Sequence, residues 1–365
     1  MAYHAPRAPE LENKMRRRFL IGSRAPSIKM LTWIDGNPTF AFQRGKIHIV
    51  ALFGTTCGLC SNALADLGQL QEKYGDLGVE AFGVAANESA ATAEEVGAQV
   101  NTWLNKELPN SKIPIATDHT GEMQRLWSVA SGSRRVPTMF VVNRDDSIAY
   151  IGYPEPADPG LLERVLIKII DDTWDTSAEA KKAHEKWLEG VLRFRAIAAV
   201  NIKDLQTALS TIGEGIKAIP DNLPFREAHV ELLLGKMHDF EAGWIASAQL
   251  ARNAVEKNDD DWLLAAMQQL FGSAYDYSRL PFAERFSMGK ELSERILTLC
   301  PRQDGISRAR SYATIAPYFY ESGDKDGAVE SIAHALELVE GESLPDDVKQ
   351  KYVAQLAEAL AEYKG

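Results

Sequence analysis

The stretch IHIVALFGTTCGLC, from Ile47 to Cys60, decides how the first half of the chain folds. Its first seven residues, up to Phe53, are almost continuously apolar, which is typical of a central strand that is covered on both faces. Two cysteines, Cys57 and Cys60, follow with two residues between them, and a helical pattern at residues 59–75 begins there. The stretch therefore predicts a buried strand that leads through a cysteine turn into a helix.

Short β-rich runs alternate with helical patterns over residues 21–172 on either side of this stretch. Such alternation predicts an α/β domain with a central, partly parallel mixed sheet flanked by helices. The polar residues Asn143–Asp146 stand between two apolar runs and predict a hairpin turn. We expect strands at Ile47–Phe53, Val79–Ala85, Pro114–Thr117, Thr138–Val142 and Ser147–Gly152, and helices at 59–75, 92–107, 120–130 and 158–171.

The spacing of Cys57 and Cys60 at a helix start fits a redox dithiol. The exposed N–H groups and the positive dipole end of a helix stabilise a thiolate, so that the outer sulfur can attack a disulfide and the inner sulfur can resolve it. A zinc site needs about four ligands, and the one other cysteine is Cys300, a residue we expect to be a buried structural thiol. We therefore expect no metal and no cofactor. The alternative is that the two cysteines belong to a structural turn.

Several landmarks accompany the cysteine pair along residues 22–172. They are Gly22-x-x-Ala25-Pro26, Asp118-x-x-Gly121, Val136-Pro137-Thr138 followed by Phe140–Val142, and Ile148–Gly152. Together they make this part of the chain resemble a thioredoxin-fold domain of the TlpA/redoxin group of thiol–disulfide oxidoreductases.

The resemblance implies a role for each residue of the motif. Cys57 is the nucleophile, Cys60 is the resolving thiol, and Pro137 is a cis proline that faces the pair. A cis proline there would free the backbone of Val136 to pair with a protein substrate. We also expect Thr56 and Arg135 to contact the substrate. The alternative for Pro137 is a trans proline that opens an edge strand.

This sequence departs from the family pattern around the dithiol. Thr56 replaces an aromatic residue, Ala51 replaces an acidic or amide residue, and Ala63 stands where relatives often have glutamate. The usual buried proton acceptor behind the inner cysteine is therefore missing. Glu80 on the adjacent predicted strand is a candidate substitute, and a solvated strand residue is the alternative.

Two arginines, Arg134 and Arg135, come directly before Val136. One guanidinium beside Cys57 would stabilise its thiolate, and the alternative is a pair of solvated loop residues. The departures also leave open a non-catalytic scaffold protein of redoxin type.

Two other redoxin chemistries are weaker alternatives. Peroxiredoxins carry Pro-x-x-x-Thr-x-x-Cys, and those positions are Val50 and Gly54 here, so a thiol peroxidase is less favoured. Copper-delivery relatives use a wider cysteine spacing and a histidine. His119 could be offered as that ligand, but a solvated loop histidine is the simpler interpretation.

Residues 177–365 are helical throughout. We expect helices at Ala178–Val200, Ile202–Ile219, Phe225–Asp239, Phe240–Lys257, Trp262–Tyr275, Ala283–Leu299, Ile306–Ser322, Lys325–Val339 and Asp346–Tyr363. The segment from Tyr312 to Leu336 resembles one tetratricopeptide repeat, with a turn at Gly323 that ends its first helix. The predicted domains are thus a polar arm at 1–20, a thioredoxin-like redox domain at 21–174 and a helical, tetratricopeptide-like array at 175–365, which would bind a partner.

Charge and hydropathy limit the possible partners. The net charge is −11, from 40 basic and 51 acidic residues, which disfavours nucleic acid as a partner. No apolar run approaches the roughly 20 residues of a membrane span. Residues 15–20 look like a twin-arginine signal without its apolar region. We therefore expect a cytoplasmic protein, with an exported or periplasmic one as the alternative. Its expected partners are a protein thiol or disulfide substrate and an electron donor or acceptor protein.

Overall fold

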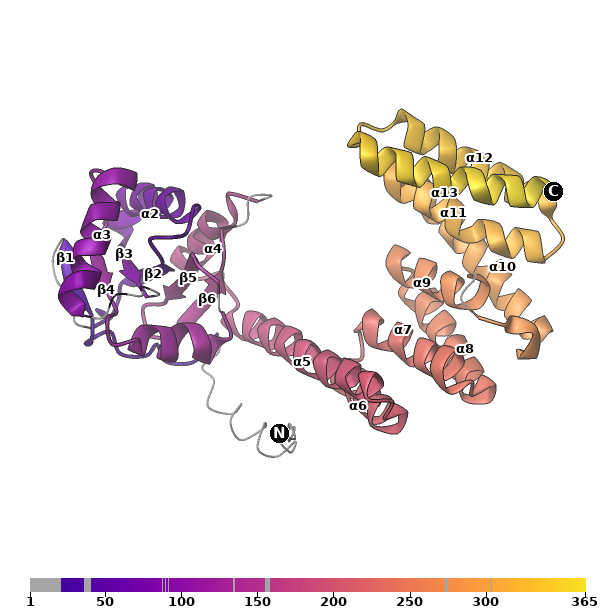
Figure 1. Ribbon diagram of the computed structural model, residues 1–365, viewed down its shortest axis with the longest axis horizontal. Coiled ribbons are helices and arrows are strands. Elements are labelled where there is room, and N and C mark those ends of the chain that lie inside the picture. Colours follow the sequence, from indigo (N-terminus) through magenta and orange to yellow (C-terminus); the bar gives the residue numbers. More distant parts are fainter. Residues whose placement is uncertain are drawn as a thin grey trace. The chain divides into compact units, whose positions relative to one another are not determined.

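The computed structural model describes residues 21–35, 41–86, 88, 90, 92–133, 135–154, 158–272, 275–302 and 304–365. The predicted arm at 1–20 lies outside these residues. The chain forms two compact units that divide between Lys186 and Trp187 (Figure 1). We call them the redoxin unit and the helical unit.

The redoxin unit is built on a mixed sheet that has six strands among the described residues, in the order β1-β4-β3-β2-β5-β6. Strand β3 lies parallel to both β2 and β4, whereas β1, β5 and β6 run antiparallel to their neighbours. The apolar run that was predicted to be a central strand is β2, and all seven of its residues are buried. The strands are β1 Thr32–Asp35, β2 Ile47–Phe53, β3 Val79–Ala85, β4 Ile115–Thr117, β5 Thr138–Val142 and β6 Ile148–Gly152.

Helices cover one face of the sheet. Side chains alternate between the two faces of a strand, and those of Ile47, Ile49, Ala51 and Phe53 pack in one core with the helices. The opposite face is covered by residues 28–31 and by Trp127 of a π-helical turn. These elements are α2 Cys60–Tyr74, α3 Ala93–Glu107 and α4 Leu161–Ile170 on the helical face, the turn Gln124–Val129 on the other face, and a short 3₁₀ segment at Gly75–Leu77 after α2.

The predicted hairpin between β5 and β6 is confirmed. The backbone N–H of Asn143 donates to the carbonyl oxygen of Ser147 at 2.7 Å, and Asp146 donates back to Asn143 at 3.0 Å. Strand β1 was not predicted. It pairs with β4 at the edge of the sheet.

The helical unit confirms the predicted all-α region. Asp204, Asp239 and Asp324 each cap a helix by accepting a hydrogen bond from a backbone N–H three residues later, the interaction that favours aspartate at such positions. Gly323 has a φ of 90° at the predicted turn. The helices are α5 Thr176–Asn201, α6 Leu205–Ala218, α7 Leu223–Glu231 with a π-helical continuation at Leu232–Met237, α8 Phe240–Lys257, α9 Asp260–Phe271, α10 Phe282–Leu299, α11 Gly305–Glu321, α12 Lys325–Gly341 and α13 Asp346–Lys364, with 3₁₀ segments at Tyr277–Arg279 and Cys300–Arg302.

The two units divide inside α5, whereas the predicted boundary at 174/175 lies just before this helix. The first turns of α5 belong to the redoxin unit, where a Cβ built on Gly22 would lie 3.9 Å from side-chain atoms of Thr176 and Ala180. Trp174 also donates from Nε1 to the carbonyl oxygen of Ala149 at 2.9 Å.

Among the described residues, no helix combines the length and the apolar character that crossing a bilayer requires.

Candidate active site

The cysteine pair lies where the sequence places it, between the end of β2 and the start of α2. Cys57 and Cys60 form a disulfide with Cα atoms 5.5 Å apart. The turn is closed by two backbone hydrogen bonds, from Cys57 to Gly54 at 3.1 Å and from Cys60 to Cys57 at 3.2 Å. The pair therefore opens the helix directly, with Cys60 as its first residue.

The two sulfur-bearing residues differ in burial. Cys57 is half-buried, whereas Cys60 has no exposed surface and packs in the core beneath α2. The first turn of α2 carries no acidic side chain, so no carboxylate of that turn opposes the favourable effect of the helix dipole on a thiolate. Solvent can reach Cys57, and Cys60 is shielded behind it.

The loop before β5 faces the cysteine pair. The Val136–Pro137 peptide bond is cis, as the family resemblance implies. The carbonyl oxygen of Val136 lies 3.7 Å from Sγ of Cys57, a distance at which a reduced thiol can donate a hydrogen bond to it. The structure thus brings Val136 and Pro137 together with Cys57.

Thr56 and Arg135 are both exposed. Thr56 lines a pocket beside Cys57. The guanidinium of Arg135 lies over the ring of Tyr153, 5.1 Å from its centre. Its role beside the Cys57 thiolate stays a prediction, and Arg134 lies outside the described residues.

A hydrogen-bonded group next to the pair was not predicted. Glu88, which follows β3, accepts hydrogen bonds from the backbone N–H of Thr55 at 2.7 Å and from its hydroxyl at 2.6 Å. Gln99 of α3 donates to the same hydroxyl at 2.9 Å and to Glu88 at 2.6 Å. Because β2 and β3 are parallel neighbours, the residues that follow them meet at one edge of the sheet. That rule places the segment after β3 near the cysteine turn, but no local motif in the sequence marks Glu88 within it.

A pocket of about 430 Å³ lies on the α3 side of Cys57. Thr55, Thr56, Gly58 and Ser61 form the wall next to the cysteine, and α3 forms the other wall with Gln99, Thr102, Trp103, Lys106 and Glu107. Trp103 is half-buried and its ring packs 5.3 Å from that of Phe53. The disulfide therefore borders a concave surface with an aromatic side chain in it.

The prediction that Glu80 is the proton acceptor for Cys60 is wrong. The Glu80 carboxylate contacts Lys46 and lies 3.4 Å from Nε2 of His48. In the sheet, Glu80 stands at the start of β3 and is the register partner of His48. The cysteines follow the other end of β2. Among the described residues, no group of three histidine, cysteine or acidic side chains is placed to hold a metal ion, and His119 is exposed.

Comparison with known proteins agrees with this geometry. A family model described as Redoxin matches residues 21–166. Protein FixW from Rhizobium leguminosarum is 41% identical over 213 residues, which cover 56% of this chain and 94% of that protein. Thiol-disulfide oxidoreductase ResA from Bacillus thuringiensis subsp. konkukian is 25% identical over 129 residues, or 35% of this chain and 66% of ResA.

Solved structures are similar to part of the chain. The crystal structure of a thiol:disulfide interchange protein DsbE from Chlorobium tepidum, described as putative, has a TM-score of 0.33 at 23% identity, and the match covers 41% of this chain and 96% of that one. The match with Protein FixW is longer than the redoxin match and spans nearly all of that protein. The chain belongs to the redoxin family of thioredoxin-like proteins, whose members include thiol–disulfide oxidoreductases.

Proposed function

We propose that the protein exchanges its Cys57–Cys60 dithiol with disulfides of protein substrates, and that the helical unit binds a protein partner. The observation that carries the redox proposal is the arrangement of a half-buried Cys57 and a fully buried Cys60 at the start of α2, with the Val136 carbonyl 3.7 Å from Sγ of Cys57. An accessible sulfur next to a shielded one is what sequential attack and resolution require.

The exchange proceeds in two balanced steps. The Cys57 thiolate attacks one sulfur of the substrate disulfide, forms a mixed disulfide and releases the other substrate sulfur as a thiolate, which takes up a proton. The deprotonated Cys60 then attacks Sγ of Cys57 and releases the second substrate thiolate. Two electrons pass from the dithiol to the substrate, and the protein is left with the Cys57–Cys60 disulfide. A dithiol protein would return it to the reduced form.

The single-cysteine variants test this proposal. With Cys60→Ser, the Cys57 thiolate should attack a disulfide of native insulin, and the mixed disulfide should accumulate because no Cys60 thiolate can resolve it. It should be detected by mass spectrometry, and Cys57→Ser should form none. Reduction of native insulin by the wild type, with dithiothreitol as the electron donor, should be lost in both variants and kept in Cys300→Ser, because Cys300 is a buried cysteine without a disulfide partner. A wild-type protein without insulin-reducing activity would favour the scaffold alternative.

A further inference from the structure

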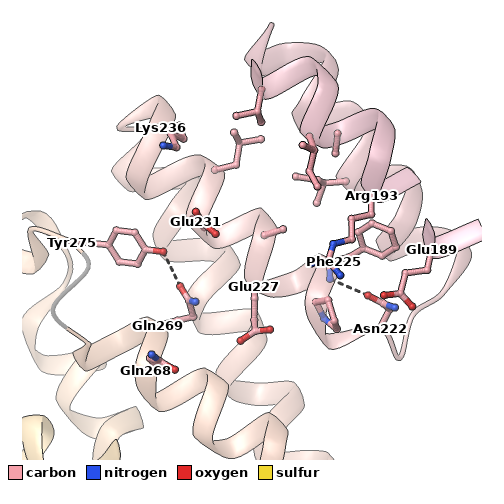
Figure 2. Close-up of a pocket in the computed structure, with 17 residues that line it drawn as sticks. Glu189, Arg193, Asn222, Phe225, Glu227, Glu231, Lys236, Gln268, Gln269 and Tyr275 are labelled. Carbon is pink, nitrogen blue, oxygen red and sulfur yellow. Dashed lines mark hydrogen bonds between the residues drawn. The ribbon is translucent and has the colours of Figure 1, made fainter. Parts of the chain in front are cut away.

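A groove of about 540 Å³ runs along α7 within the helical unit. Its two sides differ in character. Helices α5 and α6 contribute Ala196, Ile197, Val200 and Ile212, whereas the other side presents Gln268, Gln269 and Tyr275 (Figure 2). Ile197 is 51% exposed. The groove therefore has an aliphatic wall and a polar wall, with α7 between them.

Two carboxylates on α7 face this groove. Glu227 and Glu231 are four residues apart, which places them on the same side of the helix, and both line the groove (Figure 2). Like charges at this spacing repel each other. Among the ion pairs of the described residues, none includes either carboxylate, and the nearby Arg310 is paired with Asp261 at 3.1 Å.

The surroundings of Glu227 disfavour its negative charge. Burial raises the pKa of Glu227, and the charges of Asp261 and Glu231 raise it further, while Arg310 opposes them. A second pocket shares Glu227 and adds Asp221, Asp259 and Asp261 to the lining. Carboxylates thus outnumber the cations Arg193, Lys236 and Arg310 along the two linings.

Two residues of the polar wall are hydrogen-bonded to each other. The hydroxyl of Tyr275 donates to Oε1 of Gln269 at 3.2 Å (Figure 2). Burial, together with Glu231 and Glu227, raises the pKa of Tyr275 to about 12, so the phenol keeps its proton at neutral pH. A fixed wall lowers the entropy cost of binding.

We propose that this groove binds a segment of a partner protein in which a lysine or arginine stands next to aliphatic side chains, a proposal that rests on the partner-binding role of the helical unit. The cationic group lies between Glu227 and Glu231 and relieves their repulsion. The aliphatic side chains cover Ile197 and Val200. The acidic excess of the two linings excludes an acidic segment.

The full-length protein is tested with a positional-scanning library of nine-residue peptides. We expect the wild type to select lysine or arginine with neighbouring leucine, isoleucine or valine. The double variant Glu227→Gln/Glu231→Gln should bind the selected peptides about tenfold more weakly. The matched control is Glu358→Gln/Glu362→Gln, because these exposed residues have the same spacing on α13 and line neither pocket.

Several results would overturn the proposal. These are a wild type that selects no peptides, one that selects acidic or uncharged peptides, and a double variant that keeps the preference for basic residues. Glu231 is exposed, so Glu231→Gln alone should fold normally and show about half of the loss in binding free energy if the double variant unfolds. Ile197→Ser should weaken the aliphatic preference and leave the basic preference unchanged.

Insulin reduction measured on the same preparations separates the two proposals. Peptide selection without insulin reduction would support the proposal for the groove and contradict the proposed redox function. Insulin reduction without peptide selection would do the reverse, because Cys57 and Cys60 line neither pocket of the helical unit.

Discussion

The carboxylate of Glu88 accepts a hydrogen bond from each donor of Thr55, the backbone N–H at 2.7 Å and the hydroxyl at 2.6 Å. Thr55 stands two residues before Cys57, in the turn that leaves β2. Gln99 donates to both partners from α3. The turn that carries the accessible cysteine is therefore tied to the segment after β3 and to a helix, and its conformation does not depend on the disulfide alone.

A double-mutant cycle measures the strength of the Thr55–Glu88 hydrogen bonds. Thr55→Val and Glu88→Gln should each lower the free energy of unfolding of the redoxin unit, and their effects should be coupled by about 1–2 kcal/mol, because hydrogen bonds to a charged group are stronger than neutral ones. Urea unfolding followed by circular dichroism gives the values. Thr102→Val is the control, since its hydroxyl donates to Ala98 of the same helix and should be additive with Glu88→Gln. Additivity in both cycles would show that the Thr55–Glu88 hydrogen bonds contribute nothing to the free energy of unfolding.

Burial predicts the order in which the thiols react. In the reduced protein at neutral pH, iodoacetamide should modify Cys57 at least about tenfold faster than Cys60 or Cys300, because thiolate character and access govern the rate. Cys60 and Cys300 are 0% and 1% exposed. Peptide mass spectrometry after timed quenching gives the three rates. In guanidinium chloride the three rates should converge, and faster modification of Cys60 in the native protein would reverse the proposed roles.

Gly83 of β3 allows α2 to lie close to the sheet. A Cβ at this position would come within 2.9 Å of Ile115, 3.1 Å of Leu64 and 3.3 Å of Phe53. Gly83→Ala should therefore lower the free energy of unfolding by about 1–3 kcal/mol through overpacking. Gly97 of α3 has no atom within 4 Å of a built Cβ, and Gly97→Ala should raise stability by about 0.5–1 kcal/mol. Equal effects of the two substitutions on the thermal midpoint would contradict this packing.

The parts of the fold that could be predicted are those that their own short stretch of sequence determines. The run Ile47–Phe53 is apolar throughout, and its observed bounds match the prediction. Aspartate caps and glycine turns likewise mark the helices of the second unit. Strand β1 was missed because Thr32–Asp35 is short and is defined by its pairing with β4. The segment predicted as one helix at Phe225–Asp239 ends in a π-helical turn at Leu232–Met237, which sequence periodicity does not distinguish.

The same division applies to the site. Cys57, Cys60 and the Val136–Pro137 bond belong to short motifs, so the sequence indicated them. Glu88 depends on the register of two strands that are distant in the sequence, and no local motif marks it. The register also explains the error at Glu80, because this residue stands at the start of β3, and the start of a strand that is parallel to β2 lies at the edge opposite the cysteines.

His48 gives the redoxin unit a pH-dependent stability. Its side chain is 1% exposed, and burial lowers its pKa from 6.5, with Lys46 adding to the effect and Glu80 and Asp146 opposing it. Below pH 6.5 the unfolded chain therefore binds more protons than the folded one at this residue, so stability falls as the pH falls, and above pH 6.5 the contribution is complete. His48→Gln should reduce the slope of unfolding free energy against pH by up to about 1.4 kcal/mol per pH unit between pH 6.5 and 5. Urea unfolding of the wild type, His48→Gln and the exposed-loop control His119→Gln measures the slopes. His229, whose pKa burial and Arg226 also lower, is present in all three proteins and cancels in the comparison. An unchanged slope in His48→Gln would mean that the buried imidazole does not set the acid sensitivity.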